Sequence, residues 1–466
     1  MPHRYRVLTI VSVATFVASL DLFIVNIAFP SIQHDFRGTS DATLSWILSA
    51  YAIVMAALLV PAGRIADLLG RKRLFMAGLV TFVAASALCA AAPGPGWLIG
   101  ARALQAVGGA TLMPTSLALL LAEFPPKQRA LAVAVWSATG AVAAAAGPPI
   151  GGVLVQASWR WVFLVNLPIG LAVTFLAARV LRESRDTEGK RFPDLVGAVL
   201  LVIASGTLML AIIKGPEWGW LGVRTDGLFI SAALLFAAFV YRCMRHPAPV
   251  IELELFRARS FVTANIAGTL FFAAFGAMLL ASVLFLSRVW HEDVLTAGLQ
   301  IAPGPVAAAV FAVPGSLLSA RFGHRAVAAL GCVLFAAAGI WWLTRVGLQP
   351  RYVSDFLPGW LIGGAGVGLV IPTLASAATA SLPPARFATG SSVYGMTRQF
   401  GIALGIAILI AVLGTPQRSQ IMAAFRTSWE VIIGMALAGA IASAAIGRVR
   451  VAPARVETAV ELKQAV

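Results

Sequence analysis

The chain has 466 residues, of which 59% are hydrophobic and only 12% are charged. Ordinary globular proteins contain about 45–50% apolar and about 25% charged residues. A soluble protein cannot bury so much apolar surface, so the composition predicts a protein embedded in lipid. It excludes disordered, collagen-like, coiled-coil and disulfide-rich secreted chains. The net charge of +16 is spread over short loops, which favours contact with anionic lipid headgroups over a nucleic-acid partner.

Fourteen apolar stretches are each long enough to cross a bilayer as a helix, which takes about 20 residues. They are residues 7–30, 41–62, 74–92, 97–121, 130–154, 160–181, 194–213, 227–243, 261–287, 295–319, 326–344, 357–380, 388–413 and 429–447. The first stretch is too long for a signal peptide and carries Asp21 and Asn26. An even number of spans leaves both termini on one side of the membrane.

The distribution of basic residues selects that side. With the N-terminus in the cytoplasm, 24 of the 35 Lys and Arg residues fall on the cytoplasmic side and 9 on the opposite side, while Arg102 and Arg398 lie within spans. This asymmetry predicts a multi-pass protein of the cytoplasmic (inner) cell membrane with both termini in the cytoplasm.

The first and last six spans share sequence features at similar spacing. The pairs Pro114-Thr115 and Pro125-Pro126 both recur 258 residues later, and Pro61 to Gly70 recurs after 253 residues. We expect an all-α integral membrane protein with 14 transmembrane helices arranged as two six-helix halves and two extra central helices. The expected parts are a first half (1–185), two additional helices (186–250), a second half (251–450) and a cytoplasmic tail (451–466). Two related halves with a substrate path between them are typical of transporters.

Five segments carry a resemblance to a known family. The loop from Gly63 to Arg73 and the segment from Arg102 to Gln105 resemble two signatures of the major facilitator superfamily, and Gly140 to Gly152 resembles the signature of its exporters. Leu20 to Pro30 and Trp159 to Pro168 are similar to segments of its fourteen-helix drug:proton antiporters. The resemblance covers essentially the whole chain and implies multidrug efflux driven by a proton gradient, with no other cofactor.

Three positions depart from the patterns of that family. Ala106 and Phe23 stand where glycine and threonine are usual, and Pro149 is an additional proline in the exporter signature. The additional Pro149 is expected to alter the local bend of the fifth span.

Asp21 is the deepest carboxylate of the sequence. It lies about 14 residues into the first span, or about 21 Å from the cytoplasmic edge at about 1.5 Å per residue. An ionised carboxylate in lipid-like surroundings is costly, so Asp21 is a candidate proton carrier. Arg102 falls at nearly the same depth in the fourth span and is its expected partner. The resemblance implies a coupling role for Arg102, and the alternative is a static salt bridge between helices.

The loop between the second and third spans is a candidate conformational latch. Gly63 and Gly70 allow a tight turn, and Asp67 lies among basic residues that include Arg71 and Lys72. A carboxylate there accepts hydrogen bonds from a helix N-terminus or from arginines. The resemblance implies a latch that holds the outward-open state, and the alternative is a solvated basic loop.

The fifth span contains the residues of the exporter signature. They are Gly140, Gly147, Pro148, Gly151 and Gly152. Prolines bend a helix and glycines let neighbouring helices approach closely. We therefore predict a hinge, for which the structural and functional roles overlap.

Polar side chains in the motif-bearing spans are candidates for the substrate cavity. They are Asn26, Gln105, Trp136, Tyr394 and Arg398. Arg398 lies near mid-membrane with no acidic neighbour in sequence, so it contacts either cargo or backbone carbonyls at a broken helix. A cavity with one deep carboxylate and two deep arginines suits neutral, zwitterionic or anionic lipophiles better than dications.

The sequence therefore predicts a proton-coupled exporter of lipophilic small molecules whose partners are protons and membrane lipids, and which acts as a monomer. A facilitator or importer of a specific metabolite or lipid on the same fold stays open. A receptor or an enzyme is disfavoured because the sequence has no extra soluble domain and no nucleophile constellation, and no histidine or cysteine pattern predicts a metal site.

Overall fold

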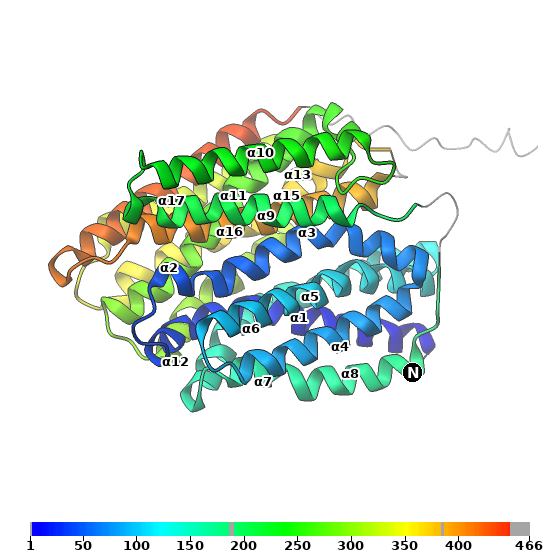
Figure 1. Ribbon diagram of the computed structural model, residues 1–466, viewed down its shortest axis with the longest axis horizontal. Coiled ribbons are helices and arrows are strands. Elements are labelled where there is room, and N and C mark those ends of the chain that lie inside the picture. The colour runs from blue at the N-terminus through cyan, green and yellow to red at the C-terminus, as the bar shows by residue number, and fades with distance from the viewer. Residues whose placement is uncertain (1, 186–190, 384–385, 448–466) are drawn as a thin grey trace, which may run out of the picture.

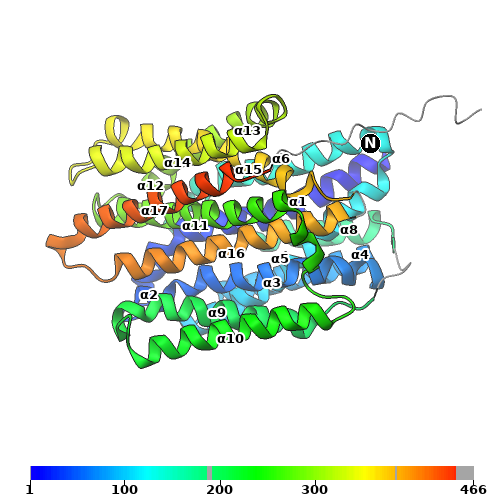
Figure 2. The same ribbon diagram turned by 90° about the horizontal axis from the view of Figure 1, so that it is seen from above.

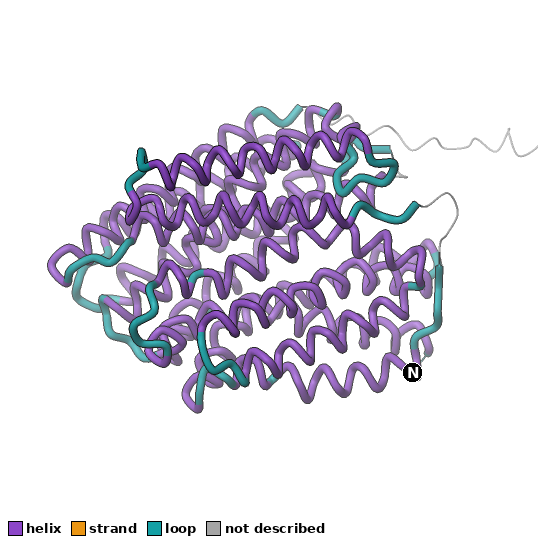
Figure 3. Tube along the Cα trace, in the orientation of Figure 1, coloured by secondary structure: helices purple, strands orange, loops and turns teal. Residues whose placement is uncertain are grey.

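The computed structural model describes residues 2–185, 191–383 and 386–447. Within this part every regular element is a helix, and Figure 3 shows these helices joined by short loops. Fourteen helices or helix pairs in the described residues are long and apolar enough to cross a membrane, which confirms the predicted number of spans and the all-α membrane fold. The predicted tail, 451–466, lies outside the described residues.

The elements follow one another in chain order (Figure 1). They are α1 (His3–Asp35), α2 (Asp41–Leu44), α3 (Trp46–Leu69), α4 (Arg71–Ala90), α5 (Pro95–Glu123), α6 (Pro126–Ala157), α7 (Trp161–Leu164), α8 (Asn166–Val180), α9 (Leu195–Trp218), α10 (Val223–Arg245), η1 (Leu253–Arg257), α11 (Arg259–Arg288), α12 (Val294–Ile301), α13 (Pro303–Phe322), α14 (His324–Arg345), η2 (Tyr352–Phe356), α15 (Leu357–Thr379), α16 (Phe387–Leu413), η4 (Arg418–Gln420) and α17 (Ile421–Ala444).

Two spans are interrupted close to a proline. Pro168 has no N–H to offer the carbonyl of Leu164, the last residue of α7, and a proline ring also clashes with the carbonyl four residues before it. The break at Val165 makes Asn166 the first residue of α8. Pro303 likewise begins α13 directly after α12. These local breaks orient the side chains beside them.

The helices form two groups with similar internal packing. In the first group α1 packs on α5, α6 and α8, and α4 packs on α5 and α8. In the second group α11 packs on α16 and α17, and α15 packs on α13 and α14. The groups meet where α3 packs on α16 and where α6 packs on α12. Figure 2 shows the same arrangement from above.

One pair of glycine crossings occurs at equivalent places in the two groups. A Cβ atom on Gly108 of α5 would lie 2.7 Å from the carbonyl oxygen of Gly78 of α4, and a Cβ atom on Gly366 of α15 would lie 2.6 Å from that of Gly331 of α14. Gly331 follows Gly78 by 253 residues and Gly366 follows Gly108 by 258 residues. These are the offsets of the sequence repeat, so equivalent helix pairs cross at equivalent places.

The helices α9 and α10 lie together along one edge of the molecule (Figure 2). There α9 packs on α10, α3 and α16. The segment after α10, residues 246–258, joins this pair to both groups through ion pairs: Arg64 of α3 to Glu252, and Arg386 beside α16 to Glu254, each at 2.6 Å between nitrogen and oxygen. We call this segment the linking segment.

Candidate proton-coupling and transport site

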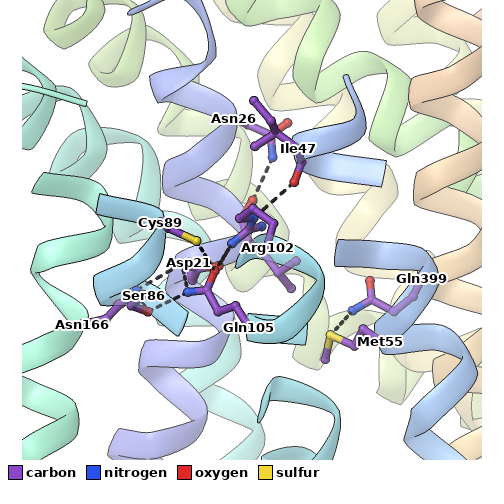
Figure 4. A network of polar contacts seen from close by, with 11 residues as sticks. Asp21, Asn26, Ile47, Met55, Ser86, Cys89, Arg102, Gln105, Asn166 and Gln399 are labelled. Atoms are coloured by element: carbon purple, nitrogen blue, oxygen red, sulfur yellow. Dashed lines mark hydrogen bonds and ion pairs between the residues drawn. The ribbon is translucent and has the colours of Figure 1, made fainter. Parts of the chain in front are cut away.

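Asp21 and Arg102 form an ion pair in the interior of the first group (Figure 4). The two side chains are 0% and 1% exposed. Asp21 comes from α1 and Arg102 from α5, at the equal depth that the sequence predicts. A buried ion pair needs further hydrogen bonds to offset the loss of hydration, so the surrounding side chains matter.

Three side chains complete the shell of Asp21. Gln105 Nε2 donates to Asp21 Oδ1 at 2.9 Å, and Asn166 Nδ2 donates to the same oxygen at 3.1 Å. Ser86 Oγ accepts from Gln105 at 2.8 Å and from Asn166 at 3.3 Å. With Arg102 donating to Oδ2, the carboxylate receives donors on both oxygens. This set of donors suits the ionised form of Asp21.

Arg102 also contacts α3. Its Nε donates to the carbonyl oxygen of Ile47 at 3.2 Å, and its guanidinium carbon lies 4.1 Å from the centre of the Tyr51 ring. A cation over an aromatic face is attracted by the ring quadrupole. The charge of Arg102 is therefore shared between α1, which carries Asp21, and α3, which packs across the interface on α16.

The shell contains one residue that the sequence analysis assigned to the substrate cavity and one that the sequence analysis missed. Gln105, predicted as a cavity residue, is fully buried against Asp21 and Arg102. Its position three residues after Arg102 on one helix face was the available signal. Asn166 had no such signal, because its approach to Asp21 depends on how α8 packs against α1 and α4.

Asp67 lies at the end of α3 and bonds to Arg71 within its own loop, with Nε 2.9 Å from Oδ1. The loop turns at Gly70, whose φ of 121° favours glycine. The bond to Arg71 is one of the arginine contacts that the sequence analysis expected for Asp67. Lys72 Nζ donates to the carbonyl of Ala178 at 2.8 Å, while Gly63 packs against Pro114.

Glu183 serves the first turn of α4. Its carboxylate accepts from the backbone N–H groups of Lys72 at 3.1 Å and Arg73 at 3.2 Å. A carboxylate at a helix N-terminus satisfies unpaired donors and complements the helix dipole. Glu183 follows α8, so its position was not evident from the sequence of the loop.

The exporter signature marks contacts of α6 with two other helices. A Cβ atom on Gly147 would lie 2.6 Å from Phe23 Cβ, and one on Gly152 would lie 2.8 Å from Leu295 Cα of α12. In return, a Cβ on Gly298 of α12 would lie 2.3 Å from the carbonyl of Pro148. The groups therefore touch backbone to backbone at this point, which lies toward the α2 end of the molecule. Gly151 packs on Ile24, and Gly140 lies near Ser19.

At the opposite end, where the N-terminus lies (Figure 1), α6 and α13 are largely exposed. Leu131 of α6 is 70% exposed and Leu317 of α13 is 68% exposed. Small residues on both helices, including Ala138 and Ser316, are exposed as well. Small residues line close helix contacts when helices pack. The close backbone contact between α6 and α12 therefore lies at the α2 end, while α6, which also packs on α13, is exposed together with α13 toward the N-terminal end.

An ion pair reinforces the contact at the α2 end. Arg288 at the end of α11 lies 2.6 Å from Asp41 at the start of α2, measured from Nη2 to Oδ2. Gln33 of α1 also donates to Asp41 at 2.6 Å. These bonds join the first helices of the two groups.

The remaining cavity candidates have separate environments. Asn26 Nδ2 donates to the carbonyl of Leu22 at 2.8 Å, and Trp136 Nε1 donates to Thr15 Oγ1 at 2.9 Å. Both bonds stay within the first group. The Tyr394 hydroxyl is buried without a hydrogen-bond partner among the described residues. Arg398, one turn further along α16, is half-buried.

Arg398 lies beside the contact between the two groups. Its neighbour Gln399 donates from Nε2 to Met55 Sδ of α3 at 2.9 Å (Figure 4). Tyr394 packs against Gly268 of α11. Arg398 falls between these two directions on the helix circumference, since successive residues are about 100° apart. It therefore points between α3 and α11, which belong to different groups.

Two packed helix groups with equivalent glycine crossings and a buried ion pair in the first are typical of a membrane transporter. The chain belongs to the Major Facilitator Superfamily, whose family model matches residues 11–406. Proteins of this class are transporters and not enzymes.

Curated relatives have names that refer to resistance and export. The chain is 35% identical over 417 residues to the multidrug resistance protein Stp of Mycobacterium tuberculosis, covering 88% of this chain and 76% of that protein. It is 32% identical to a probable actinorhodin transporter of Streptomyces coelicolor, covering 87% of this chain and 72% of that protein. It is 32% identical to the methylenomycin A resistance protein of the same species, covering 85% and 83%.

Solved structures support the fold. An auto-inhibited peptide transporter of the POT family matches with a TM-score of 0.70 at 17% identity, covering 94% of this chain and 96% of that one. A bacterial homologue of the human lysosomal transporter Spinster, inward-facing and unoccupied, matches with a TM-score of 0.69 at 17% identity, covering 96% of both chains.

Proposed function

We propose that this transporter exports lipophilic small molecules in exchange for protons. The observation that carries the proposal is the fully buried Asp21 carboxylate, paired with Arg102 and hydrogen-bonded on both oxygens. A carboxylate held in this way binds a proton only with a change in its surroundings, which is what coupling requires. The resistance and export functions named for the relatives support the direction of transport.

Protonation of Asp21 weakens its bond to Arg102. The guanidinium keeps its charge, because arginine does not release its proton in proteins. It then relies on the contacts with Ile47 and Tyr51 on α3. Because α3 packs on α16 of the other group, a shift of Arg102 toward α3 alters the interface between the groups. Asp21 and Arg102 thus act as the proton-coupling residues.

The geometry corresponds to a state that is open toward the N-terminal end. For the opposite state, the contact of Gly152 and Gly298 between α6 and α12 must break and the exposed halves of α6 and α13 must close. The residues of the exporter signature act as a hinge by allowing this close contact in one state. They are Gly140, Gly147, Pro148, Gly151 and Gly152. Asp67, with Gly63, Gly70, Arg71 and Lys72, acts as the latch in the other state.

The cargo is a neutral, zwitterionic or anionic lipophile. Arg398 points between the two groups, and one turn away is the Tyr394 hydroxyl, which has no hydrogen-bond partner among the described residues, while Asp21 is buried and paired with Arg102. Asn26 and Trp136 border the path from the first group. Because the one fully buried carboxylate that the described residues place deep in a span, Asp21, is already paired, a path with the positive charge of Arg398 disfavours dications.

The protein works as a monomer in the cytoplasmic membrane, with the N-terminal end of the bundle facing the cytoplasm. The two groups move as halves, 1–185 and 251–450, and α9 and α10 (within 186–250) cover their seam at α3 and α16. The excess of Lys and Arg on the N-terminal side supports this topology.

Inverted membrane vesicles test the function. Uptake of ethidium, Nile red and anilinonaphthalene sulfonate is measured after an acid-inside pH gradient is imposed on vesicles with wild-type protein, Asp21→Asn or the exposed control Asp226→Asn. We expect gradient-driven uptake of at least one dye by the wild type and the control, and at least a tenfold loss in Asp21→Asn. Full gradient-driven uptake by Asp21→Asn contradicts the assignment. Uptake that does not depend on the pH gradient in any of the three proteins supports the alternative, a facilitator.

A further inference from the structure

Asn166 differs from the other side chains that bond to Asp21. Its side chain is 0% exposed, and its Nδ2 donates to Asp21 Oδ1 and to Ser86 Oγ. Its Oδ1 is buried without a hydrogen-bond partner among the described residues. Buried polar atoms are nearly always paired, and an unpaired acceptor beside a titratable carboxyl points to a second arrangement in which it is used.

Gln105 has no such freedom. Its Nε2 donates to Asp21 and Ser86, and its Oε1 accepts from Arg102 Nη1 at 2.6 Å and lies 3.8 Å from Cys89 Sγ. Rotating this amide breaks several bonds at once. Arg102 has donors and no acceptor. Neither side chain can therefore receive a bond from a protonated Asp21 at low cost.

A proton on Asp21 Oδ1 creates an O–H group that faces two N–H donors. The new group needs an acceptor, and rotation of the Asn166 amide by about 180° brings Oδ1 to the place of Nδ2. We propose that Asn166 is a positioning residue that turns its amide when Asp21 is protonated and accepts the hydrogen bond of the carboxyl O–H. The proton comes from a hydronium ion: its O–H bond breaks and leaves water, the Oδ1–H bond forms, and no other covalent bond changes.

The local fold permits this rotation. Asn166 is the first residue of α8, directly after the break near Pro168, and its side chain can turn without disturbing a helical hydrogen bond. The charged or titratable groups of the described residues around Asp21 are Arg102 from α5, Tyr51 from α3 and Cys89 from α4. A phenol and a thiol are neutral near pH 7, so neither provides a second charge beside Asp21 and Arg102.

The inference rests on the proposed proton coupling, and infrared titration separates the two. The carbonyl band of protonated Asp21 is recorded against pH on purified protein, and Asp21→Asn identifies the band. The test variant is Asn166→Leu. The matched control is Asn265→Leu, which removes a buried amide of α11 that bonds to Phe261 and Thr397 and does not touch Asp21.

In Asn166→Leu we expect the carbonyl band to move to higher wavenumber, because the O–H loses its acceptor. Asn265→Leu leaves the band unchanged. Asn166→Thr, which keeps an accepting hydroxyl, gives a band that lies between those of Asn166→Leu and the wild type.

An unmoved band overturns the inference, because Asn166 then serves only as a donor to the ionised form. If the wild type shows no band that depends on Asp21, the proposed proton coupling fails instead. Should Asn166→Leu not fold, Asn166→Ala makes the same comparison with less bulk.

Discussion

The helix pairs α4–α5 and α14–α15 share a backbone arrangement and differ in what they enclose. Both cross at two glycines, Gly78 with Gly108 and Gly331 with Gly366. Beyond the crossing in the first pair lie Ser86, Cys89, Arg102 and Gln105, which surround Asp21. The equivalent positions in the second pair, by the same offsets, are Gly339, Trp342, Trp360 and Gly363.

The second pair is filled by aromatic rings. Trp342 and Trp360 lie 5.5 Å apart in an edge-on arrangement, and Phe356 stacks on Trp342 at 5.2 Å. The indole N–H of Trp342 donates to the carbonyl of Phe356 at 2.9 Å. Buried aromatic clusters are tightly packed and carry no charge to be changed. One repeat therefore holds a group that responds to protons, while its counterpart holds a fixed apolar cluster.

The largest expected effect on stability comes from removing the charged partner of Asp21 in the first helix pair. Arg102→Leu leaves the Asp21 carboxylate buried and unpaired, so we expect a loss of about 3–5 kcal/mol in stability. Adding Asp21→Asn to the same chain restores most of this loss. Thermal melting in detergent of the single and double variants measures the coupling. Equal melting of wild type and Arg102→Leu contradicts the pairing.

Trp360→Ala disrupts the aromatic cluster of the second helix pair. We expect a loss of about 3 kcal/mol from the cavity it leaves. The pH dependence of transport by the molecules that remain folded stays that of the wild type, because no titratable contact is removed. Melting in detergent and the pH profile of vesicle uptake check the two halves of this prediction. A shifted pH profile means that the clusters are coupled more directly than the packing indicates.

Arg398→Ala tests a position at which the two groups differ. Arg398 in the second group corresponds, by the repeat, to Gly140 in the first. We expect efflux of an anionic lipophile to fall about tenfold and that of a cationic one to rise, with a neutral one least affected. Uptake of the three dyes, measured together with melting, separates cargo contact from bracing. An equal loss of uptake for all three dyes, together with a large drop in thermal stability, contradicts a contact between Arg398 and the cargo.

The smallest effect is expected at the linking segment. The hydrogen bond from Arg386 holds the pKa of Glu254 below its ordinary value of 4.5. A lowered pKa means that the pair stabilises the protein above pH 4.5 and that this stabilisation is lost as the pH falls through the lowered value. Glu254→Gln should change vesicle uptake near pH 7 by no more than about twofold, because exposed pairs contribute little. Arg64→Gln, at the half-buried pair, should have the larger effect.

Much of the fold was predictable because lipid imposes length and composition on each span. The number of spans and the equal depth of Asp21 and Arg102 follow from counting residues along apolar stretches. The observed helices run past several predicted ends, as at His3 and Asp35 in α1, because backbone hydrogen bonds continue where apolar side chains stop. The site itself was predictable only in part, since Gln105 was assigned to the cavity and Asn166 and Glu183 were missed.

The sequence by itself determined which residues lie at which depth, because depth follows from the rise per residue and the hydrophobic limits of the bilayer. The tertiary structure decided which way each side chain faces and what it meets. The approach of Asn166 to Asp21, the contact of Gly152 with α12 and the aromatic cluster around Trp360 all join helices far apart in sequence. Such contacts depend on the rotation and crossing of packed helices, which no local pattern specifies.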